Sequence, residues 1–114
     1  MTETEFLQRL ETALRRVENA IDAADADIEV ERSGNVLTLE LADGSRIVIN
    51  GQAPTQQLWL AARSGAHHYT WRDGNWLDTR DASEFFASLS RIVSAEGGVA
   101  LLIGGPTRDE NTPD

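Results

Sequence analysis

The stretch from Asp43 to Ala61 constrains the fold most, because it contains two short segments in which apolar and polar residues alternate. In the first segment, Ile47 and Ile49 point to one side of an extended chain, since successive strand residues face opposite ways. In the second segment, Leu58 and Leu60 repeat the pattern. Two neighbouring strands that each offer one apolar face predict a half-buried antiparallel sheet.

The linker between these segments carries two turn residues, Gly51 and Pro54. If the aliphatic faces are buried, the opposite face of the sheet presents Asn50, Gln57 and Trp59 to water. A tryptophan beside two amides has the composition of a protein-binding hot spot, although a single exposed tryptophan can also lack any function. The sequence therefore predicts a partner-binding surface on this face.

Amphipathic helices are predicted on both sides of the strand region. From Thr4 to about Ala24, apolar residues recur at helical spacing, with Thr2 or Thr4 as the N-cap. These apolar residues are Phe6, Leu10, Leu14, Val17 and Ile21. A second helix is predicted after Asp81 and Glu84, which have the spacing of a capping box, and before the Gly97–Gly98 pair. Its apolar residues are Phe85, Phe86, Leu89, Ile92 and Val93.

Between the helices, short alternating segments separated by glycine turns predict an antiparallel meander of five to six strands. The expected strands cover residues 27–31, 37–41, 46–50, 57–61, 67–72 and 76–78. The Asp43–Gly44 pair suits the positive φ angles of a type I′ turn. The order helix, meander, helix predicts an α+β fold, an α-β sandwich with both helices on one face of the sheet. One domain would span residues 1–105, with 99–103 packed against the helices and 106–114 disordered.

The composition excludes several classes of function. The 114 residues carry 19 Asp and Glu against 10 basic residues, all arginine, for a formal net charge of −9, and contain no cysteine. This charge repels nucleic-acid phosphates and favours cations or basic protein surfaces. The lack of cysteine removes disulfides, thiolate metal ligands and thiol nucleophiles. No signal peptide or apolar run of bilayer length is recognisable, so we expect a cytoplasmic protein without membrane contact.

Acidic residues are concentrated in the first third of the chain, where the predicted elements place seven of them on one surface, a predicted acidic ridge. Its members are Glu11, Glu18, Asp22, Asp25, Asp27, Glu29 and Glu31. The first four fall within about 60° of one another on a helix wheel. The last three would be exposed on an edge strand if Ile28 and Val30 joined the core.

The ridge is costly for stability, because acids near a helix C-terminus meet the negative end of its dipole, at roughly 0.3–1 kcal/mol each. Its simplest interpretation is a solvated face that keeps a small protein in solution. The functional interpretation is a cation site, since carboxylate clusters suit hard cations such as iron, manganese, calcium or magnesium. We expect modest affinity, because no liganding loop is visible. An EF-hand loop starting at Asp25 is excluded, because its sixth position would be Val30 and its twelfth Val36.

Other chemistry is poorly indicated. His67 and His68 are adjacent on a predicted strand, so they point to opposite faces and cannot chelate one ion together. We find no nucleophile elbow, phosphate-binding loop, dinucleotide fingerprint or two-histidine metal helix. The carboxylates lie on an exposed surface that does not exclude water, so a catalytic role is not expected.

The run IVINGQAPTQQLWLA, followed by the aromatic strand HHYTW and the strand NWLD, resembles the sheet of the frataxin family, most of all its bacterial members. The family pattern is a strand ending in Val-Ile-Asn, then Gln-x-Pro, then Gln-(Ile/Leu/Val)-Trp-Leu. The residues that match it are Val48, Ile49, Asn50, Gln52, Pro54, Gln57, Leu58, Trp59 and Leu60. The resemblance covers residues 3 to 103, with the elements in the same order.

The resemblance implies a function in iron-sulfur cluster assembly. Frataxin-like proteins bind ferrous and ferric iron weakly through acids of the first helix and strand, and they dock on the cysteine desulfurase and the scaffold protein. Carried over by position, the iron-binding residues would be Glu18, Asp22, Asp25, Asp27, Glu29 and Glu31. The partner-binding residues would be Glu11, Glu18, Asp22, Asn50, Gln57 and Trp59.

Two other functions stay open at this point. One is an iron-oxidising or iron-storing protein, which needs a protected site or an iron-dependent oligomer; without iron, a monomer is expected. The other is a regulatory docking module that needs no metal. A size measurement with iron and oxygen would distinguish the first, and ridge mutants that lose partner binding without affecting iron would distinguish the second.

Overall fold

The first helix of the computed structural model, which describes residues 1–98 and 103, follows from its sequence signals. Helix α1 spans Glu3–Ala24 and begins with a capping box: the Thr2 hydroxyl accepts the Glu5 N–H at 3.0 Å, and the Glu5 carboxylate accepts the Thr2 N–H at 2.9 Å. Its apolar stripe is buried, as predicted. The helix ends at Asp25, which takes the left-handed conformation with φ +53°.

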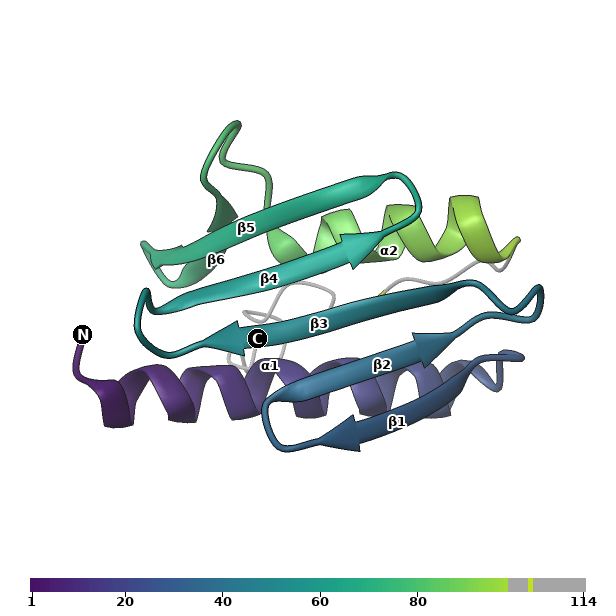
Figure 1. The fold of residues 1–114 in the computed structure, drawn as a ribbon, viewed down its shortest axis with the longest axis horizontal. Coiled ribbons are helices and arrows are strands. Elements are labelled where there is room, and N and C mark those ends of the chain that lie inside the picture. Colours follow the sequence, from purple (N-terminus) through teal and green to yellow (C-terminus); the bar gives the residue numbers. More distant parts are fainter. Residues whose placement is uncertain (99–102, 104–114) are drawn as a thin grey trace, which may run out of the picture.

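Six antiparallel strands follow in a meander whose spatial order equals the sequence order. The strands are β1 (Glu29–Ser33), β2 (Val36–Glu40), β3 (Arg46–Gln52), β4 (Gln57–Ala62), β5 (Gly65–Arg72) and β6 (Asn75–Asp78). Helix α2 spans Phe85–Gly97. Figure 1 shows both helices on one side of the sheet, with α1 behind the half that contains β1 to β3 and α2 behind the other half. The predicted α-β sandwich is confirmed.

The core lies between the sheet and the two helices. Alternate residues of β2, β3 and β4 are fully buried, from Leu37 and Leu39 to Leu58 and Leu60. Larger rings fill the β5 and β6 side, where Trp76 meets Phe6 of α1 edge to face at 5.9 Å between ring centroids. In the described part of the chain, neither helix combines the length and the apolar character needed to cross a membrane.

The sequence analysis predicted Gly51 as a turn residue, and this is wrong. Gly51 is part of β3 and lies opposite Leu58 of β4. The reason is its close approach to α1. A Cβ atom at this position would lie 2.1 Å from Cδ2 of Leu10, which is 1% exposed. Glycine therefore allows the first helix to pack against the end of β3.

The prediction of a type I′ turn at Asp43–Gly44 is wrong. Only Gly44 has a positive φ there, +89°, while the Asp43 carboxylate accepts the Ser45 N–H at 2.9 Å. Positive φ angles at both turn residues occur instead at Asp73–Gly74, +53° and +82°, in the two-residue loop between β5 and β6. Tight pairing of Arg72 with Asn75 demands that geometry there.

The predicted capping box at Asp81 and Glu84 is also wrong. The backbone of Glu84 stays extended and pairs with Leu77 in an isolated bridge, so α2 begins three residues later than it would with Asp81 as its N-cap. Glu84 is itself the N-cap, and its carboxylate accepts the N–H groups of Phe86 and Ala87 at 2.9 and 3.0 Å. Asp81 accepts the Ser83 N–H instead.

Of the predicted C-terminal segment, residues 99–103 packed against the helices, the structure describes only Ile103. Ile103 is 2% exposed and donates its N–H to Ser90 Oγ of α2 at 2.7 Å, which confirms packing against the helices there. The rest of the expected apolar segment, 99–102, and the tail 106–114 lie outside the described residues.

Candidate functional site

The pairing of β1 with β2 decides how the predicted acidic ridge is arranged. Arg32 lies opposite Leu37, and Val30 lies opposite Leu39, so both face the helices with those core leucines. Glu29 and Glu31 therefore face the other side, the open face of the sheet. The seven carboxylates do not share one surface, because the edge strand separates two groups.

The first group lies at the end of α1 and is called here the helix-end acids: Glu18, Asp22 and Asp25. These residues line an open hollow between α1 and β1, together with Ile21 of α1 and with Ile28 and Val30 on the strand side. Ile28 packs against the core as expected, but Val30 stays 37% exposed, because β1 is an edge strand and no other described element covers it there. The last turn of α1 contains no basic residue, so the dipole adds to the negative charge of the hollow.

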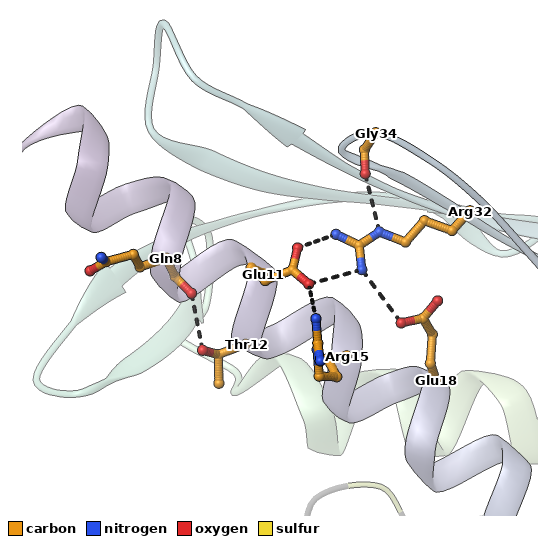
Figure 2. Close-up of polar contacts among 7 residues, drawn as sticks. All are labelled: Gln8, Glu11, Thr12, Arg15, Glu18, Arg32 and Gly34. Atoms are coloured by element: carbon orange, nitrogen blue, oxygen red, sulfur yellow. Dashed lines mark hydrogen bonds and ion pairs between the residues drawn. The ribbon is translucent and has the colours of Figure 1, made fainter.

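Arg32 is the functional-site residue that sequence reasoning missed. Its guanidinium donates to both carboxylate oxygens of Glu11 and, at 3.4 Å, to Glu18, while its Nε donates to the Gly34 carbonyl at 3.1 Å. Arg15 donates to the same Glu11 carboxylate at 2.8 Å. Figure 2 shows Arg32 reaching from the strand to both glutamates of α1. A signal existed: if the alternation predicted for residues 27–31 is continued by one residue, Arg32 follows Ile28 and Val30 on the helix-facing side.

This network changes the charge of the ridge. Hydrogen bonds from Arg32, and secondly from Arg15, hold the pKa of Glu11 at about 2, well below its usual value of 4.5. The same contact with Glu11 raises the pKa of Arg32. Glu11 is thus neutralised by its partners, and Glu18 shares the charge of Arg32. Asp22 and Asp25 form no ion pair within the described residues.

We expect Arg32→Gln to weaken the pH dependence of stability between pH 4.5 and 2. Because the folded-state pKa of Glu11 is depressed, its contribution to stability is complete above the unfolded value and is lost as the pH falls toward 2. Removing the main cause brings the folded pKa back toward its usual value, so the Tm difference between wild type and variant should shrink on acidification. Arg46→Gln, on the open face, is the charge-matched control. If the Tm difference between wild type and Arg32→Gln stays constant from pH 7 to pH 2, Arg32 is not the cause of the lowered Glu11 pKa.

The second group of acids lies on the open face of the sheet. Glu29 and Glu31 stand opposite Glu40 and Thr38 of β2. Glu40, which sequence reasoning had not included, is opposite Arg46 and forms a loose ion pair with it at 3.8 Å. Asp27 is exposed in the connection before β1 rather than within the strand. These acids therefore border the same face as the predicted partner-binding residues.

Asn50, Gln57 and Trp59 lie together on the open face, as predicted. Asn50 is opposite Trp59, and the Trp59 indole N–H donates to the Gln57 side chain at 2.8 Å. Trp59 also stacks on His68 of β5, with ring centroids 4.5 Å apart and ring planes 23° apart. The tryptophan is consequently half-buried rather than fully exposed. Its orientation is set by two neighbours, which gives the face a pre-ordered aromatic surface.

The two histidines point to opposite faces, as predicted. His68 stacks on Trp59, whereas His67 lies on the helix side, with Nδ1 3.3 Å from the buried carboxylate of Asp78 and 3.0 Å from Nη2 of Arg80. Among residues 1–98 and 103, no three His, Asp or Glu side chains are arranged to hold one metal ion. Any cation at the helix-end acids would therefore meet a site that is open and only partly assembled.

The fold and these surfaces define a class of small α-β sandwiches that present an acidic helix end and an open, polar sheet face with an ordered tryptophan. A family model described as a frataxin-like domain matches residues 1–99, and the chain belongs to this frataxin family. The iron-sulfur cluster assembly protein CyaY of Ralstonia pickettii strain 12J is 53% identical over 108 residues, which cover 90% of this chain and 95% of that protein.

Solved structures agree with this assignment. The frataxin from Psychromonas ingrahamii is 32% identical and superposes with a TM-score of 0.85, covering 89% of this chain and 96% of its own. A trimeric frataxin from the yeast Saccharomyces cerevisiae, complexed with ferrous iron, is 29% identical with a TM-score of 0.65, covering 86% of this chain and 88% of its own.

Proposed function

We propose that this protein takes part in iron-sulfur cluster assembly, where it binds iron weakly and docks on the cysteine desulfurase and the scaffold protein. The observation that carries the proposal is its 53% identity, over 95% of the relative's length, to an iron-sulfur cluster assembly protein CyaY. The acidic helix end and the open sheet face support the two parts of the proposal separately.

Iron would be held at the helix-end acids, Glu18, Asp22 and Asp25. Asp27, Glu29 and Glu31, on the other side of β1, would bind cations as a separate group. Carboxylate oxygens suit ferrous and ferric iron, and also other divalent cations. Affinity is low, because the carboxylates are exposed to water and no closed ligand set is present in the described residues. Arg32 lowers it further by competing for Glu18.

Docking would use both surfaces. The acids of α1, Glu11, Glu18 and Asp22, would attract a basic patch of the desulfurase and speed its association. Since Arg15 and Arg32 neutralise Glu11, Asp22 should contribute more to this attraction than Glu11 does. Asn50, Gln57 and Trp59 would supply short-range contacts that slow dissociation of the assembled complex.

The alternative function, iron oxidation or storage, is supported by one observation, the trimeric state of the yeast relative complexed with ferrous iron. It requires that this chain assemble with iron, since the acids of a single copy lie open to solvent. Light scattering during aerobic iron addition distinguishes the two functions. Growth into large particles supports storage, and a constant monomer mass supports the assembly function.

The proposed iron site is tested with Asp25→Gly. Asp25 has a left-handed backbone, φ +53°, at the negative end of α1, so glycine relieves both the backbone strain and the charge. We expect this variant to be about 1 kcal/mol more stable, a few degrees in Tm, and to bind ferrous iron about fivefold more weakly, since an exposed unit charge at 4 Å is worth ~1 kcal/mol.

Asp73→Gly is the matched control, because Asp73 has the same φ of +53° in a turn at the other side of the sheet. It should gain stability without any change in iron affinity. Amide signals of residues 18–31 should shift or broaden with iron in the wild type, while those of 85–97 stay unaffected. Iron-induced shifts centred on His67 and His68, or equal affinity in all three proteins, would refute the site.

A further inference from the structure

A second surface of α1, near the start of the helix, has a character opposite to that of the acidic end. A groove between α1, the β5–β6 turn and the start of α2 has an aromatic floor beneath basic side chains. The residues that matter for its chemistry are Arg9, Thr12, Arg16, Trp71, Trp76 and Phe86. Trp71 and Trp76 meet edge to face at 5.4 Å between centroids, so the two rings pack against each other in the floor.

Both arginines lie over aromatic rings. The guanidinium carbon of Arg9 is 4.5 Å from the ring centroid of Trp71, and that of Arg16 is 4.9 Å from the ring centroid of Phe86. The two residues are seven positions apart on α1, which places them two turns, or about 10 Å, apart along one side of the helix. The groove therefore has two cationic positions separated by an apolar span, with the Thr12 hydroxyl between them.

Arg9 differs from most arginines of the described chain. Arg15, Arg32, Arg46, Arg63 and Arg80 each form an ion pair with a carboxylate. Arg9 forms no such pair in the described residues, although the chain has 19 acids for 10 bases. The groove lining includes the carboxylate of Glu84, which is already used as the N-cap of α2, and Glu5, one turn before Arg9, accepts the Thr2 N–H in the capping box of α1. An available guanidinium on a tryptophan is a residue pair typical of binding hot spots.

We propose that this groove binds an acidic peptide segment of a partner protein. A large apolar side chain of the segment would cover the aromatic floor, and a carboxylate beside it would meet Arg9. Charge complementarity selects such an occupant: the rest of a chain with net charge −9 repels an acidic segment, so the groove is where it can bind. The planar guanidinium of Arg9 can donate two parallel hydrogen bonds to one carboxylate. This inference does not depend on iron binding or on the acidic helix end.

The test uses the peptide acetyl-Asp-Glu-Leu-Phe-Asp-Glu-amide, titrated into the full chain and followed by amide and indole NMR signals. We expect shifts in residues 9–16, 71–76 and 84–86, including the Trp71 indole. Arg9→Gln should weaken binding about tenfold, the value of one charge-assisted bidentate contact. Arg46→Gln removes the same charge on the opposite face of the sheet and should bind within about twofold of wild type. Arg9→Lys keeps the positive charge but cannot donate two parallel hydrogen bonds, so its peptide affinity should lie between those of wild type and Arg9→Gln.

Four outcomes would overturn the proposal. They are the absence of shifts at a peptide concentration of about 1 mM, equal binding of the Asn/Gln version of the peptide, equal losses in Arg9→Gln and Arg46→Gln, and shifts confined to the open face. Sedimentation analysis tests whether the groove binds a second copy of this chain. If the wild type self-associates and Arg9→Gln abolishes this, the groove binds a second copy of the chain and not a partner peptide. A melting curve of each variant shows that it is folded.

Discussion

Replacing Gly51 with alanine should lower the free energy of unfolding by about 1–3 kcal/mol, the usual cost of an extra methyl group in a packed core. The added Cβ would lie 2.1 Å from Cδ2, 2.8 Å from Cδ1 and 3.0 Å from Cγ of Leu10, so the whole end of that side chain must move. Leu10 is 1% exposed, so its side chain can move only against the core residues that surround it. Urea unfolding measures the loss, and Tm should fall by roughly 4 °C or more.

Gly97→Ala is the control for this prediction. The Cβ added at Gly97 would lie 3.4 Å from Leu41, an ordinary contact, and the residue is within α2, where alanine is favoured. That variant should be as stable as the wild type or slightly more stable. Combining Gly51→Ala with Leu10→Ala should lower the free energy of unfolding by less than the sum of the two single losses. Leu10→Ala removes the side-chain atoms with which the added Cβ would overlap. Strict additivity would show that the strain lies elsewhere.

Trp59→Ala should speed dissociation from the desulfurase-scaffold complex about 30-fold, which corresponds to ~2 kcal/mol, if this face docks as proposed. The indole is already held by Gln57 and His68, so little conformational freedom is lost on binding. Its effect on the isolated protein should be small, because Trp59 lies on the open face and contributes nothing to the buried core. Surface binding kinetics and thermal melting are measured on the same protein sample.

Val48→Ala provides the comparison for Trp59→Ala, because Val48 is half-buried on the same open face but lies next to Ala61 rather than in the aromatic stack. It should leave dissociation within about twofold of wild type. A Trp59→Ala protein that unfolds, yet binds the partner normally per folded molecule, would mean that the docking surface lies elsewhere.

Local sequence patterns predicted the elements and their faces well. The helix of residues 3–24 and the burial of Ile47, Ile49, Leu58 and Leu60 follow from periodicity, because the period of a helix or strand is a property of neighbouring residues. The grouping of Asn50, Gln57 and Trp59 was predictable for the same reason, since adjacent strands of a hairpin share their faces. The resemblance to the frataxin family, carried by this hairpin, identified the family correctly.

Features that depend on residues far apart in the chain could not be read in this way. The turn at residues 41–45, which is closed by the hydrogen bonds Gly44 N–H to Leu41 O and Leu41 N–H to Ser45 O, and the later start of α2 both arose where backbone pairing outweighed local side-chain preferences. The role of Gly51 depends on Leu10, 41 positions earlier, and only their packing shows why the position has no side chain. A turn and a close contact call for the same residue type, so the sequence alone did not distinguish them.

The sequence by itself determined that this chain is a two-layer α-β sandwich with acids at the end of its first helix and an amide and aromatic patch on its open sheet face. The tertiary structure alone decided how the charges meet. The register of β1 on β2 turned Arg32 toward Glu11 and Glu18 and turned Glu29 and Glu31 away from them. The physical reason is that a shift of one residue in register reverses every side chain of a strand, and register is set by pairing between strands.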